Sequence, residues 1–547
     1  MLNIHQKFCR ETFYDGKLVG FEPVYGENFN FAYDVVDAIA QAEPLRRAML
    51  WCNESGEEHT FTFADISKAS NRAANFFASL GIGKGDRVLL ILKRHYQFWF
   101  ALLGLHKLGA VGIPATNQLT KKDISYRCNA AGVKAVICTT DGDVTEHVES
   151  AMGDCPTVEL KISVHGKYQN WVDFDTEFVK FSDTMKRVET RAEDPMLIYF
   201  TSGTTGMPKM VCHDFTYPIA HIVTAKYWQN VVPDGLHLTI SDTGWMKSMW
   251  GKLYGQWFME AGIFVCDFDR FHAEAILPLF AKYKITTFCA PPTMYRFFIK
   301  EDLSKYDLSS LTYACIAGEP LNPEVYNQFL KATGLKLMEG FGQSETTLVL
   351  FNPIGTNPKP GSTGMPNPAY QVDLIDREGN SVPTGEVGEI VIRTLGKKPA
   401  GLFNGYYLDK ERTESVWSND IYHTGDTAWR DEDGYFWYIG RNDDIIKSSG
   451  YRIGPFEIES VLMEHPAVLE CAITGVPDPV RGQVVKATIV LAKGYEASEE
   501  LKKELQVYVK KQTAPYKYPR VIEFVTELPK TISGKIRRID IRGGADQ

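Results

Sequence analysis

The chain has 547 residues, of which 44% are hydrophobic, and a formal net charge of -9. A chain of this length can bury several hydrophobic cores, so we expect two or more domains. The acidic balance and the dispersed charges argue against the basic face that a nucleic-acid partner requires.

The first 17 residues lack the basic segment, apolar stretch and cleavage site of an export signal. The most apolar stretch, residues 98–115, is interrupted by His106 and Lys107. This favours a buried helix followed by a strand over a membrane span, and we expect no integral membrane segment. The 10 cysteines contain no C-x-x-C pair, which argues against a zinc site or a disulfide framework. Together these features predict a soluble, cytoplasmic protein with reduced thiols.

From about residue 60 to residue 340, short β-rich apolar runs alternate with longer amphipathic stretches. This alternation is typical of α/β layers with mostly parallel sheets. The clearest strand candidates are residues 87–92, 134–139, 196–200, 286–290 and 312–318. Between about 360 and 440, closely spaced Gly and Pro turns separate short strands, which predicts a small β-structure.

A new pattern begins after "GRNDD" at residues 440–444. It predicts a helix near 455–464, strands near 467–474 and 484–491, a charged helix near 497–512 and a strand near 520–526. We therefore expect a large N-terminal domain of layered α/β sheets plus the small β-structure over residues 1–441. A small, mobile α+β C-terminal domain follows over residues 442–547, joined by a tight hinge.

The stretch "YFTSGTTGMPKM", residues 199–210, combines hydroxyl side chains, glycines and a lysine. Such a loop offers many donors to phosphate oxygens, although a plain Ser/Thr/Gly turn with one solvated lysine has the same composition. The pattern of the P-loop NTPases fails, because Pro208 precedes Lys209 and Met210 follows it. The candidate phosphate-binding residues are Thr201, Ser202, Gly203, Thr204, Thr205, Gly206 and Lys209.

This loop resembles the phosphate-binding signature of the adenylate-forming superfamily. That superfamily comprises AMP-forming acyl-CoA synthetases, firefly-type luciferases and the adenylation domains of peptide synthetases. Further matches follow in the superfamily's order: "GEPL" at 318–321, "GFGQSET" at 340–346, "YHTGD" at 422–426, "GRNDDIIKSSGYRIGPFEIE" at 440–459 and "PKTISGK" at 529–535. The stretches at 209–230 and 241–255 look most like the medium-chain acyl-CoA synthetases.

The resemblance implies a reaction in two halves. A carboxylate attacks the α-phosphorus of ATP to give an acyl-adenylate and pyrophosphate, and the thiol of coenzyme A then displaces AMP. Because an anion must approach a polyanion, magnesium and cationic donors have to offset the repulsion. The implied partners are ATP, Mg²⁺, coenzyme A as co-substrate and a small-molecule carboxylic acid, and a homo-oligomer is possible.

The superfamily's magnesium ligand matches Glu345, with Thr204 beside it, and its catalytic lysine matches Lys535. Thr204 and Thr205 would contact the β- and γ-phosphates, and Gln343 and Thr346 the α-phosphate. Without this match, Glu345 would be read as a carboxylate at a helix start and Lys535 as a solvated lysine.

The resemblance to the superfamily also implies which residues would bind the nucleoside. Asp426 would accept hydrogen bonds from both ribose hydroxyls, which suits an anion, although an Asp in a Gly-Asp turn is common in loops. Phe341 would stack on the adenine. The other residues of this part are Gly318, Glu319 and Pro320 along the adenine face, Gly340 and Gly342 beside Phe341, and Arg441 and Arg452 at the ribose and phosphates.

Lys535 would obstruct the thiol in the second half-reaction, so the superfamily rotates its C-terminal domain about a pivot that matches Asp443. After rotation, the CoA-binding stretch Ser449, Gly450 and Tyr451 would face the active site, with glycine leaving room for the pantetheine arm. Basic residues near the nucleotide end of coenzyme A could be Arg481, Lys517, Arg520, Arg537 or Arg538.

The acyl pocket should be lined by residues 241–255 with Gly318 and residues 340–342. Its candidate residues are Trp245, Met246, Lys247, Trp250 and Gly251. The bulky side chains suggest a pocket of limited depth for short, medium or branched acyl chains. Lys247 either points to solvent or disfavours long chains.

The alternatives to this function are four: an aryl acid such as benzoate as the substrate, a separate carrier protein as acyl acceptor, a luciferase-like oxygenase and an inactive binding module.

Overall fold

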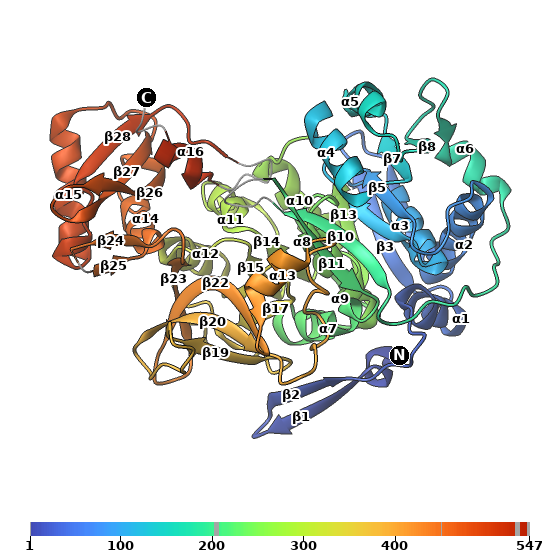
Figure 1. The fold of residues 1–547 in the computed structure, drawn as a ribbon, viewed down its shortest axis with the longest axis horizontal. Helices are drawn as coiled ribbons and strands as arrows, with labels where there is room; N and C mark the ends of the chain where they lie inside the picture. Colours follow the sequence, from blue (N-terminus) through green and yellow to red (C-terminus); the bar gives the residue numbers. More distant parts are fainter. Residues whose placement is uncertain (1, 202–206, 450, 531–535, 544–547) are drawn as a thin grey trace.

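The computed structural model describes residues 2–201, 207–449, 451–530 and 536–543, apart from the side chain of Arg452. The chain forms a large N-terminal part and a smaller C-terminal lobe on one side of it (Figure 1). Within the described ranges the strands assemble into five sheets, the smallest of which is the N-terminal hairpin of β1 (Cys9–Tyr14) and β2 (Lys17–Pro23). The mixed α/β class expected from the sequence is confirmed.

The first large sheet has the order β11-β10-β6-β5-β7-β8-β9. Its strands are parallel except for the hairpin of β10 and β11. Its strands are β5 (Arg87–Ile91), β6 (Val111–Pro114), β7 (Ala135–Thr139), β8 (Leu160–Val164), β9 (Val172–Asp173), β10 (Pro195–Thr201) and β11 (Lys209–Asp214).

The second large sheet has the order β18-β17-β16-β15-β14-β12-β13-β3-β4 and is parallel from β16 to β3. Its strands are β3 (Arg47–Asn53), β4 (Glu58–Thr62), β12 (Leu236–Thr239), β13 (Gly262–Asp267), β14 (Thr287–Ala290), β15 (Tyr313–Ala317), β16 (Leu337–Gly342), β17 (Leu348–Phe351) and β18 (Met365–Pro366). The five strand candidates predicted between residues 60 and 340 all lie in these two sheets.

Two helices form a layer between these sheets. Every residue of α3 (Gln97–Leu108) is buried, as expected for the apolar stretch that includes His106 and Lys107. It packs on β6 of the first sheet, while α2 (Phe63–Ser79) packs on α3 and on β3 and β4 of the second. Gly104 of α3 allows the close approach, because a Cβ there would lie 3.0 Å from both Ala73 Cβ and the Ala74 backbone nitrogen.

Helices of the large part cover the outer faces of the sheets (Figure 1) or form short connections. They are α1 (Ala38–Ala42), α4 (Lys121–Ala131), α5 (Val144–Ala151), α6 (Phe174–Glu177), α7 (Tyr217–Val223), α8 (Met246–Gly251), α9 (Tyr254–Phe258), α10 (Ala273–Tyr283), α11 (Pro292–Phe298), α12 (Pro323–Thr333) and α13 (Lys410–Val416). In the part of the chain that the structure describes, no helix is both long enough and apolar enough to cross a membrane.

The small β-structure expected between residues 360 and 440 is an antiparallel sheet with its own hydrophobic core. Its strands are β19 (Gln371–Ile375), β20 (Val387–Arg393), β21 (Trp417–Ser418), β22 (Ile421–Arg430) and β23 (Phe436–Arg441). The last residue of β23, Arg441, pairs with Asp426 in the middle of β22.

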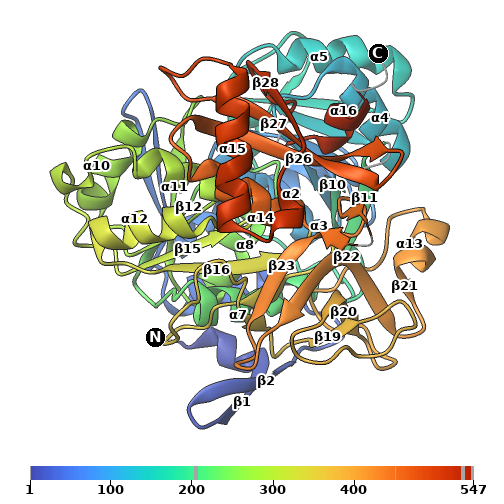
Figure 2. The ribbon, with the colours of Figure 1, turned by 90° about the vertical axis from the view of Figure 1, so that its left-hand side faces the viewer.

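The C-terminal lobe is the α+β unit expected from the sequence (Figure 2). Its elements are β24 (Ile446–Ser448), β25 (Tyr451–Ile453), α14 (Pro455–Met463), β26 (Val468–Asp478), β27 (Gly482–Leu491), α15 (Glu499–Gln512), β28 (Val521–Val525) and α16 (Arg538–Gly543). The hairpin of β26 and β27 is longer than expected, because its pairing continues through Pro477 to Asp478 and Gly482. Asn322 at the start of α12 donates from Nδ2 to the Ser460 carbonyl of α14 (3.1 Å), which joins the lobe to the large part.

An indole ring packs directly on the backbone of β16. The ring belongs to Trp228, whose Nε1 donates to the Met338 carbonyl (2.9 Å). A Cβ at Gly340 would lie 2.8 Å from Cε2 and 2.9 Å from Cζ2 of this ring. Glycine is therefore required at residue 340 by packing, quite apart from any contact with a ligand.

We expect Gly340→Ala to lower the free energy of unfolding by about 1–3 kcal/mol, the usual cost of adding a methyl group to a filled core. Gly153→Ala is the control, because a Cβ at Gly153 meets nothing within 4 Å. Denaturant unfolding of both variants measures the difference. An unchanged midpoint for Gly340→Ala would show that the indole gives way without cost.

Candidate active site

The candidate site residues gather where parallel strands of the second large sheet end. Gly318 follows β15, and Gly340 and Gly342 lie in the last three residues of β16, whose carboxyl end leads into residues 343–346. The carboxyl edge of a parallel sheet is the usual place for a ligand in α/β proteins. Sequence order alone does not bring β11 or β22 to this edge, but the tertiary structure does.

Lys209 and Glu345 are connected through a tyrosine that the sequence analysis missed. Tyr406 donates from its hydroxyl to Glu345 Oε1 (2.9 Å), and Lys209 Nζ lies 3.4 Å from the same hydroxyl. Tyr406 reaches this position because its backbone bridges to Val211 of β11. Burial lowers the pKa of Lys209, and the charge of Glu345 partly opposes that shift. No motif in the sequence marks Tyr406, since its role depends on this long-range pairing.

Asp426 is 4% exposed and lies at the centre of a second polar cluster. Its Oδ1 accepts from the Tyr438 hydroxyl (2.9 Å) and its Oδ2 from Gln343 Nε2 (2.5 Å). Gln343 in turn accepts from the Tyr422 hydroxyl at Oε1 (2.7 Å). Burial raises the pKa of Asp426 to about 6, against the opposing positive charge of Arg441. The carboxylate is thus held in a fixed orientation with a pKa near neutrality.

Thr346 closes the turn after β16 rather than pointing freely outward. Its hydroxyl accepts from the Gln343 backbone N–H (3.0 Å) and donates to the Thr347 carbonyl (2.7 Å). Gly342 is tightly packed here, because a Cβ would lie 2.5 Å from the Thr347 carbonyl oxygen. The turn therefore presents Gln343 and Glu345 from a rigid backbone.

The adenine-face candidates follow β15 directly. Gly318 has a φ of +113°, which favours glycine. The carboxylate of Glu319 is directed toward α11, with Oε2 3.4 Å from Thr293 Oγ1 and 4.0 Å from Arg296 Nη2. Pro320 follows this turn. Phe341 lies beside Tyr438, with ring centroids 6.0 Å apart.

The acyl candidates lie on α8, next to the same strand ends. Lys247 does not point to solvent, one of the two alternatives left by the sequence, but donates from Nζ to the Ala317 carbonyl (2.6 Å). Its ammonium lies 5.6 Å from the centroid of the Trp250 ring, which itself packs on Trp228 at 5.7 Å. The Trp228 ring therefore packs against both the Trp250 ring of α8 and the backbone of Gly340 in β16.

The rest of α8 is anchored to the second sheet. Gly251 lies against β12, because a Cβ would be 2.6 Å from two side-chain atoms of Thr239. Met246 is buried, and Trp245 precedes the helix and is partly exposed. The five acyl candidates are thus one continuous structural unit.

At the boundary of the two parts, Arg441 Nε of β23 pairs with Asp443 Oδ1 (3.1 Å) at the predicted hinge. The CoA candidates contact their own lobe: Arg481 Nη1 donates to Ser449 Oγ (3.1 Å), and the Tyr451 ring stacks on Tyr516 with centroids 4.0 Å apart.

Arg538 forms ion pairs within the C-terminal lobe that were not expected from the sequence. Its Nη2 donates to both oxygens of Glu459 (2.6 and 2.7 Å), and its Nη1 lies 3.6 Å from Asp444 Oδ2. Asp444 also pairs with Arg542. These pairs connect α16, which follows the "PKTISGK" motif, to the residue after the predicted hinge. The expectation that Arg538 is available to coenzyme A is therefore not supported.

Several predicted residues lie outside the described ranges: Ser202, Gly203, Thr204, Thr205 and Gly206 of the loop, Gly450 and Lys535, together with the side chain of Arg452. The residues that border them are described. Thr201 pairs with Lys209 across β10 and β11, and Lys530 bridges to Ile536.

The residues at Glu345 suit a magnesium ion. One carboxylate oxygen accepts from Tyr406, and the other has no partner in the described ranges. A carboxylate oxygen of this kind is what Mg²⁺ prefers in proteins.

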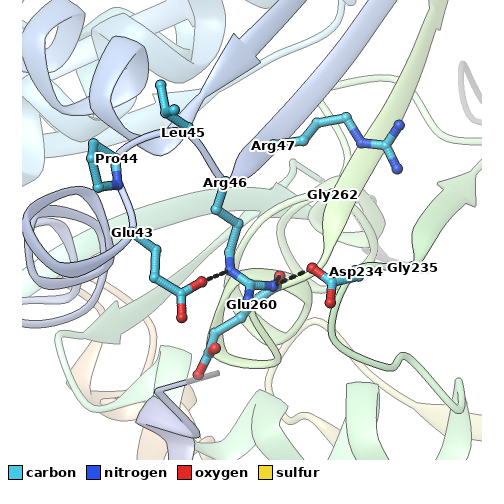
Figure 3. A pocket seen from close by; sticks show the side chains of 9 residues that line it. All are labelled: Glu43, Pro44, Leu45, Arg46, Arg47, Asp234, Gly235, Glu260 and Gly262. Atoms are coloured by element: carbon cyan, nitrogen blue, oxygen red, sulfur yellow. Dashed lines mark hydrogen bonds and ion pairs between the residues drawn. The ribbon is translucent and has the colours of Figure 1, made fainter.

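The site is distinct from the surface pocket shown in Figure 3. That pocket has a volume of about 580 Å³ and is lined by residues 43–47, 234–235, Glu260 and Gly262. It lies at the start of β3 and β13, and so at the opposite edge of the second sheet from Gly318 and Gly342. Within it, Arg46 pairs with Glu43 and Asp234.

Comparisons with known proteins agree with this site. Residues 36–407 match the model of the AMP-binding enzyme family, and residues 457–535 match the model of the AMP-binding enzyme C-terminal domain. Acyl-coenzyme A synthetase ACSM3, mitochondrial, of Mus musculus is 41% identical over 540 residues, which cover 97% of this chain and 93% of that protein. Acyl-coenzyme A synthetase ACSM5, mitochondrial, of Homo sapiens is 42% identical over 526 residues, which cover 94% and 90%.

Solved structures share the fold. The anthranilate CoA ligase AuaEII in complex with anthranoyl-AMP has a TM-score of 0.85 and 29% identity, covering 95% of this chain and 98% of that one. The Brucella canis acyl-CoA synthetase has a TM-score of 0.72 and 31% identity, covering 95% of both chains.

One expectation is wrong by this comparison. The relatives at 41–42% identity are named as mitochondrial proteins, which contradicts the cytoplasmic location predicted from the sequence. That prediction rested on reduced cysteines and on an N-terminal stretch without an export signal, and neither feature distinguishes the cytoplasm from another reducing compartment.

Matches to both family models and to relatives over nearly the whole chain show that this protein belongs to the AMP-binding enzyme family of the adenylate-forming superfamily.

Proposed function

We propose that this protein is an ATP-dependent, AMP-forming acid:CoA ligase that acts on short- or medium-chain or branched carboxylic acids. The observation that carries the proposal is that β11, the turn after β16 and β22 bring Lys209, Gln343, Glu345 and Asp426 together. The names of the relatives, acyl-coenzyme A synthetases, support the reaction class.

In the first half-reaction, Asp426 would hold the ribose, since a fixed carboxylate accepts from two hydroxyls at once. Gln343 and Thr346 would lie beside the α-phosphate, in the turn that the Gln343 N–H bond to Thr346 closes. Lys209 and the loop at 201–206 would balance the charge of the outer phosphates. Glu345, with Thr204, would hold Mg²⁺, which supplies charge neutralisation of the pyrophosphate when bound.

The second half-reaction requires the C-terminal lobe to move. Ser449 and Tyr451 contact Arg481 and Tyr516 within their own lobe. We propose rotation at Asp443, with domains over 1–441 and 442–547, to bring the stretch at 449–451 to the acyl-adenylate and to withdraw Lys535. Hinge residues absorb such backbone changes.

A panel of carboxylic acids incubated with ATP, Mg²⁺ and coenzyme A tests the proposal. We expect AMP, pyrophosphate and a thioester in equal amounts, with several neighbouring chain lengths accepted, because one methylene in an apolar pocket changes kcat/KM by only about 10- to 200-fold. Acid-dependent release of ADP, or AMP release without any thioester, would refute it.

An aryl acid is the second candidate substrate. The partly exposed Trp250 ring packs on the buried Trp228 ring, with centroids 5.7 Å apart, and offers a flat apolar surface. A structural relative at 29% identity is an anthranilate CoA ligase. Benzoate and anthranilate therefore belong in the panel beside the alkyl acids.

Lys535→Ala should reduce acyl-adenylate formation by about 10²- to 10³-fold, the effect of removing one preorganised electrostatic stabiliser. Thioester formation from supplied acyl-adenylate should persist. Lys530→Ala is the matched control, because Lys530 lies in the same motif but pairs with Glu470 (2.8 Å). Single-turnover assays of each half-reaction separate the two. An equal loss in both halves would rule out the proposed role of Lys535.

The pKa of Asp426, raised by burial to about 6, sets a pH dependence for nucleoside binding. Only the ionised carboxylate accepts from both ribose hydroxyls. Affinity should therefore be full above about pH 7 and fall roughly tenfold per pH unit below the pKa. An acyl-sulfamoyl adenosine is the suitable ligand, since it has no phosphate that titrates in this range.

Asp426→Asn provides the comparison, because the amide keeps the shape of the side chain but does not titrate. Its affinity should be lower and independent of pH over the same range, as measured by calorimetry. A wild-type affinity that does not change between about pH 5 and pH 7 would contradict the assignment.

A further inference from the structure

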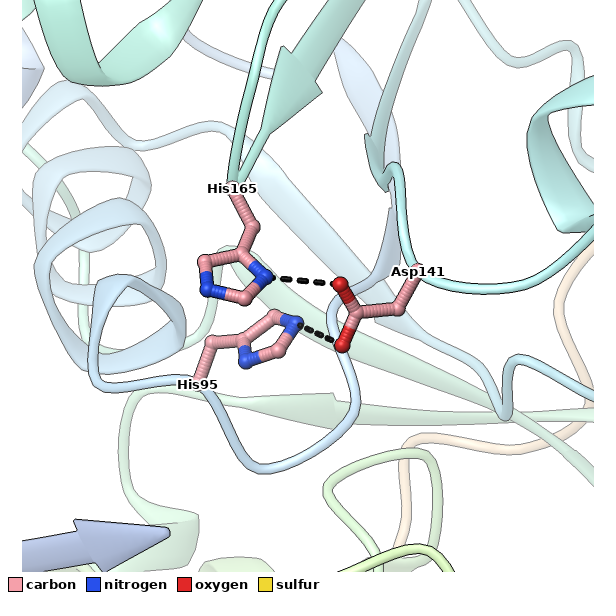
Figure 4. A group of neighbouring side chains, drawn as sticks. All are labelled: His95, Asp141 and His165. Atoms are coloured by element: carbon pink, nitrogen blue, oxygen red, sulfur yellow. Dashed lines mark hydrogen bonds and ion pairs between the residues drawn. The ribbon is translucent and has the colours of Figure 1, made fainter. Parts of the chain in front are cut away.

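A second cluster of ionisable side chains lies at the carboxyl ends of the first large sheet, outside the proposed active site. His95 follows β5, Asp141 follows β7 and His165 follows β8. These strands are parallel neighbours in the sheet, so their carboxyl ends meet at one edge. Figure 4 shows the three side chains pointing toward one another.

The donor atoms converge closely. His165 Nδ1 lies 2.6 Å from Asp141 Oδ1, and His95 Nε2 lies 3.5 Å from Asp141 Oδ2. One donor atom from each residue can be chosen so that all three lie within 4.8 Å of one another. Metal–ligand distances of about 2.0–2.2 Å place ligand atoms roughly 3–3.5 Å apart in a tetrahedral site. The His165 side chain is 48% exposed and has room to rotate. Its rotation would bring the ligand atoms from within 4.8 Å of one another to the tetrahedral spacing.

His95 is oriented as a metal-ligating histidine is. Its Nδ1 lies 2.7 Å from Asp267 Oδ2, so that nitrogen carries the proton and Nε2 has its lone pair directed at the cluster. In this structure Thr139 Oγ1, 2.8 Å from Nε2, is placed to donate to that lone pair, and a bound ion would replace this hydrogen bond. A carboxylate on the far nitrogen of a ligating histidine fixes the tautomer and makes the imidazole a stronger ligand.

The charges around the cluster suit a cation. The carboxylates are those of Asp141, Asp242, Asp267 and Asp269, and the cations that contact them are Lys93 and Arg94. Carboxylates therefore outnumber fixed cations when both imidazoles are neutral. Lys93 Nζ pairs with Asp141 Oδ2 (3.0 Å). The other oxygen, Oδ1, would then bind the ion together with His165.

The backbone holds His165 in an uncommon conformation, with a φ of +69°. Its N–H donates to Asp175 Oδ2 (2.8 Å), and Thr140 Oγ1 donates to its carbonyl (2.7 Å). Positive φ in a residue other than glycine costs free energy and persists where surrounding contacts impose it. These contacts direct the imidazole toward Asp141 instead of leaving it free in solvent.

We propose that His95, Asp141 and His165 bind one divalent metal ion of the zinc class, with a fourth position open to water. Two imidazole nitrogens and one carboxylate oxygen favour Zn²⁺, Co²⁺ or Ni²⁺ over Mg²⁺, which prefers oxygen ligands alone. The site is separate from Glu345 and from the magnesium of the proposed ligase reaction.

Titration of the metal-stripped, full-length protein with Zn²⁺ in excess Mg²⁺ tests the proposal. We expect one equivalent to bind, as measured by calorimetry. Co²⁺ should give the visible absorption bands of a four-coordinate ion without a thiolate charge-transfer band, since the proposed ligand set contains no cysteine and the ten cysteines are buried. Failure to bind one equivalent of either ion would overturn the proposal.

Variants decide which side chains are ligands. His165→Ala and Asp141→Asn should each weaken Zn²⁺ binding by at least about 100-fold and abolish the Co²⁺ spectrum. His272→Ala is the matched control, because this histidine is also exposed (57%) and pairs only weakly with Glu274 (3.7 Å). It should bind like the wild type. Circular dichroism confirms that each variant is folded, and unchanged binding in both ligand variants would refute the site.

Discussion

Helix α3 is buried along its whole length, and that constraint holds the two large sheets together. Its apolar side chains are buried between two neighbours. On one side lies β6 of the first sheet, and on the other lies α2, which packs on β3 and β4 of the second sheet. Burial of this kind is worth about 25 cal/mol for each Å² of apolar surface. The layer places the carboxyl ends of both sheets on the same side. His95 after β5 therefore pairs with Asp267 at the end of β13, and Arg94 with Asp242 after β12.

This convergence explains why polar groups concentrate at one edge of the molecule. A buried carboxylate is costly unless donors satisfy it, and the two carboxylates of the candidate site each accept at least one hydrogen bond. Asp426 accepts from Tyr438 and Gln343, and Glu345 accepts from Tyr406. Burial still shifts the pKa of Asp426 upward, so the same environment that positions the carboxylate also makes it responsive to pH.

Long polar side chains were the least predictable part of the site. Lys247 was open to two interpretations, and the structure directs it inward to the Ala317 carbonyl. Arg538 looked available to a phosphate, yet it is paired with Glu459 and lies near Asp444. A charged side chain has several partners within reach of its flexible stem, and only the fold decides which one is near. The predicted cytoplasmic location was wrong for a different reason. Reduced cysteines indicate a reducing compartment, and the cytoplasm is only one of these.

Sequence alone determined the α/β class, the succession of strands, the small antiparallel β-structure after residue 360 and the α+β unit after residue 444. These follow from local periodicity and turn residues, which act over a few residues. The motif resemblance also identified the family and named Glu345, Gln343 and Asp426. Tertiary structure alone decided that Tyr406 joins Lys209 to Glu345, that Trp228 packs on Gly340, and that His95, Asp141 and His165 meet. These residues are brought together by strand pairing and burial of distant segments, and no local pattern encodes such contacts.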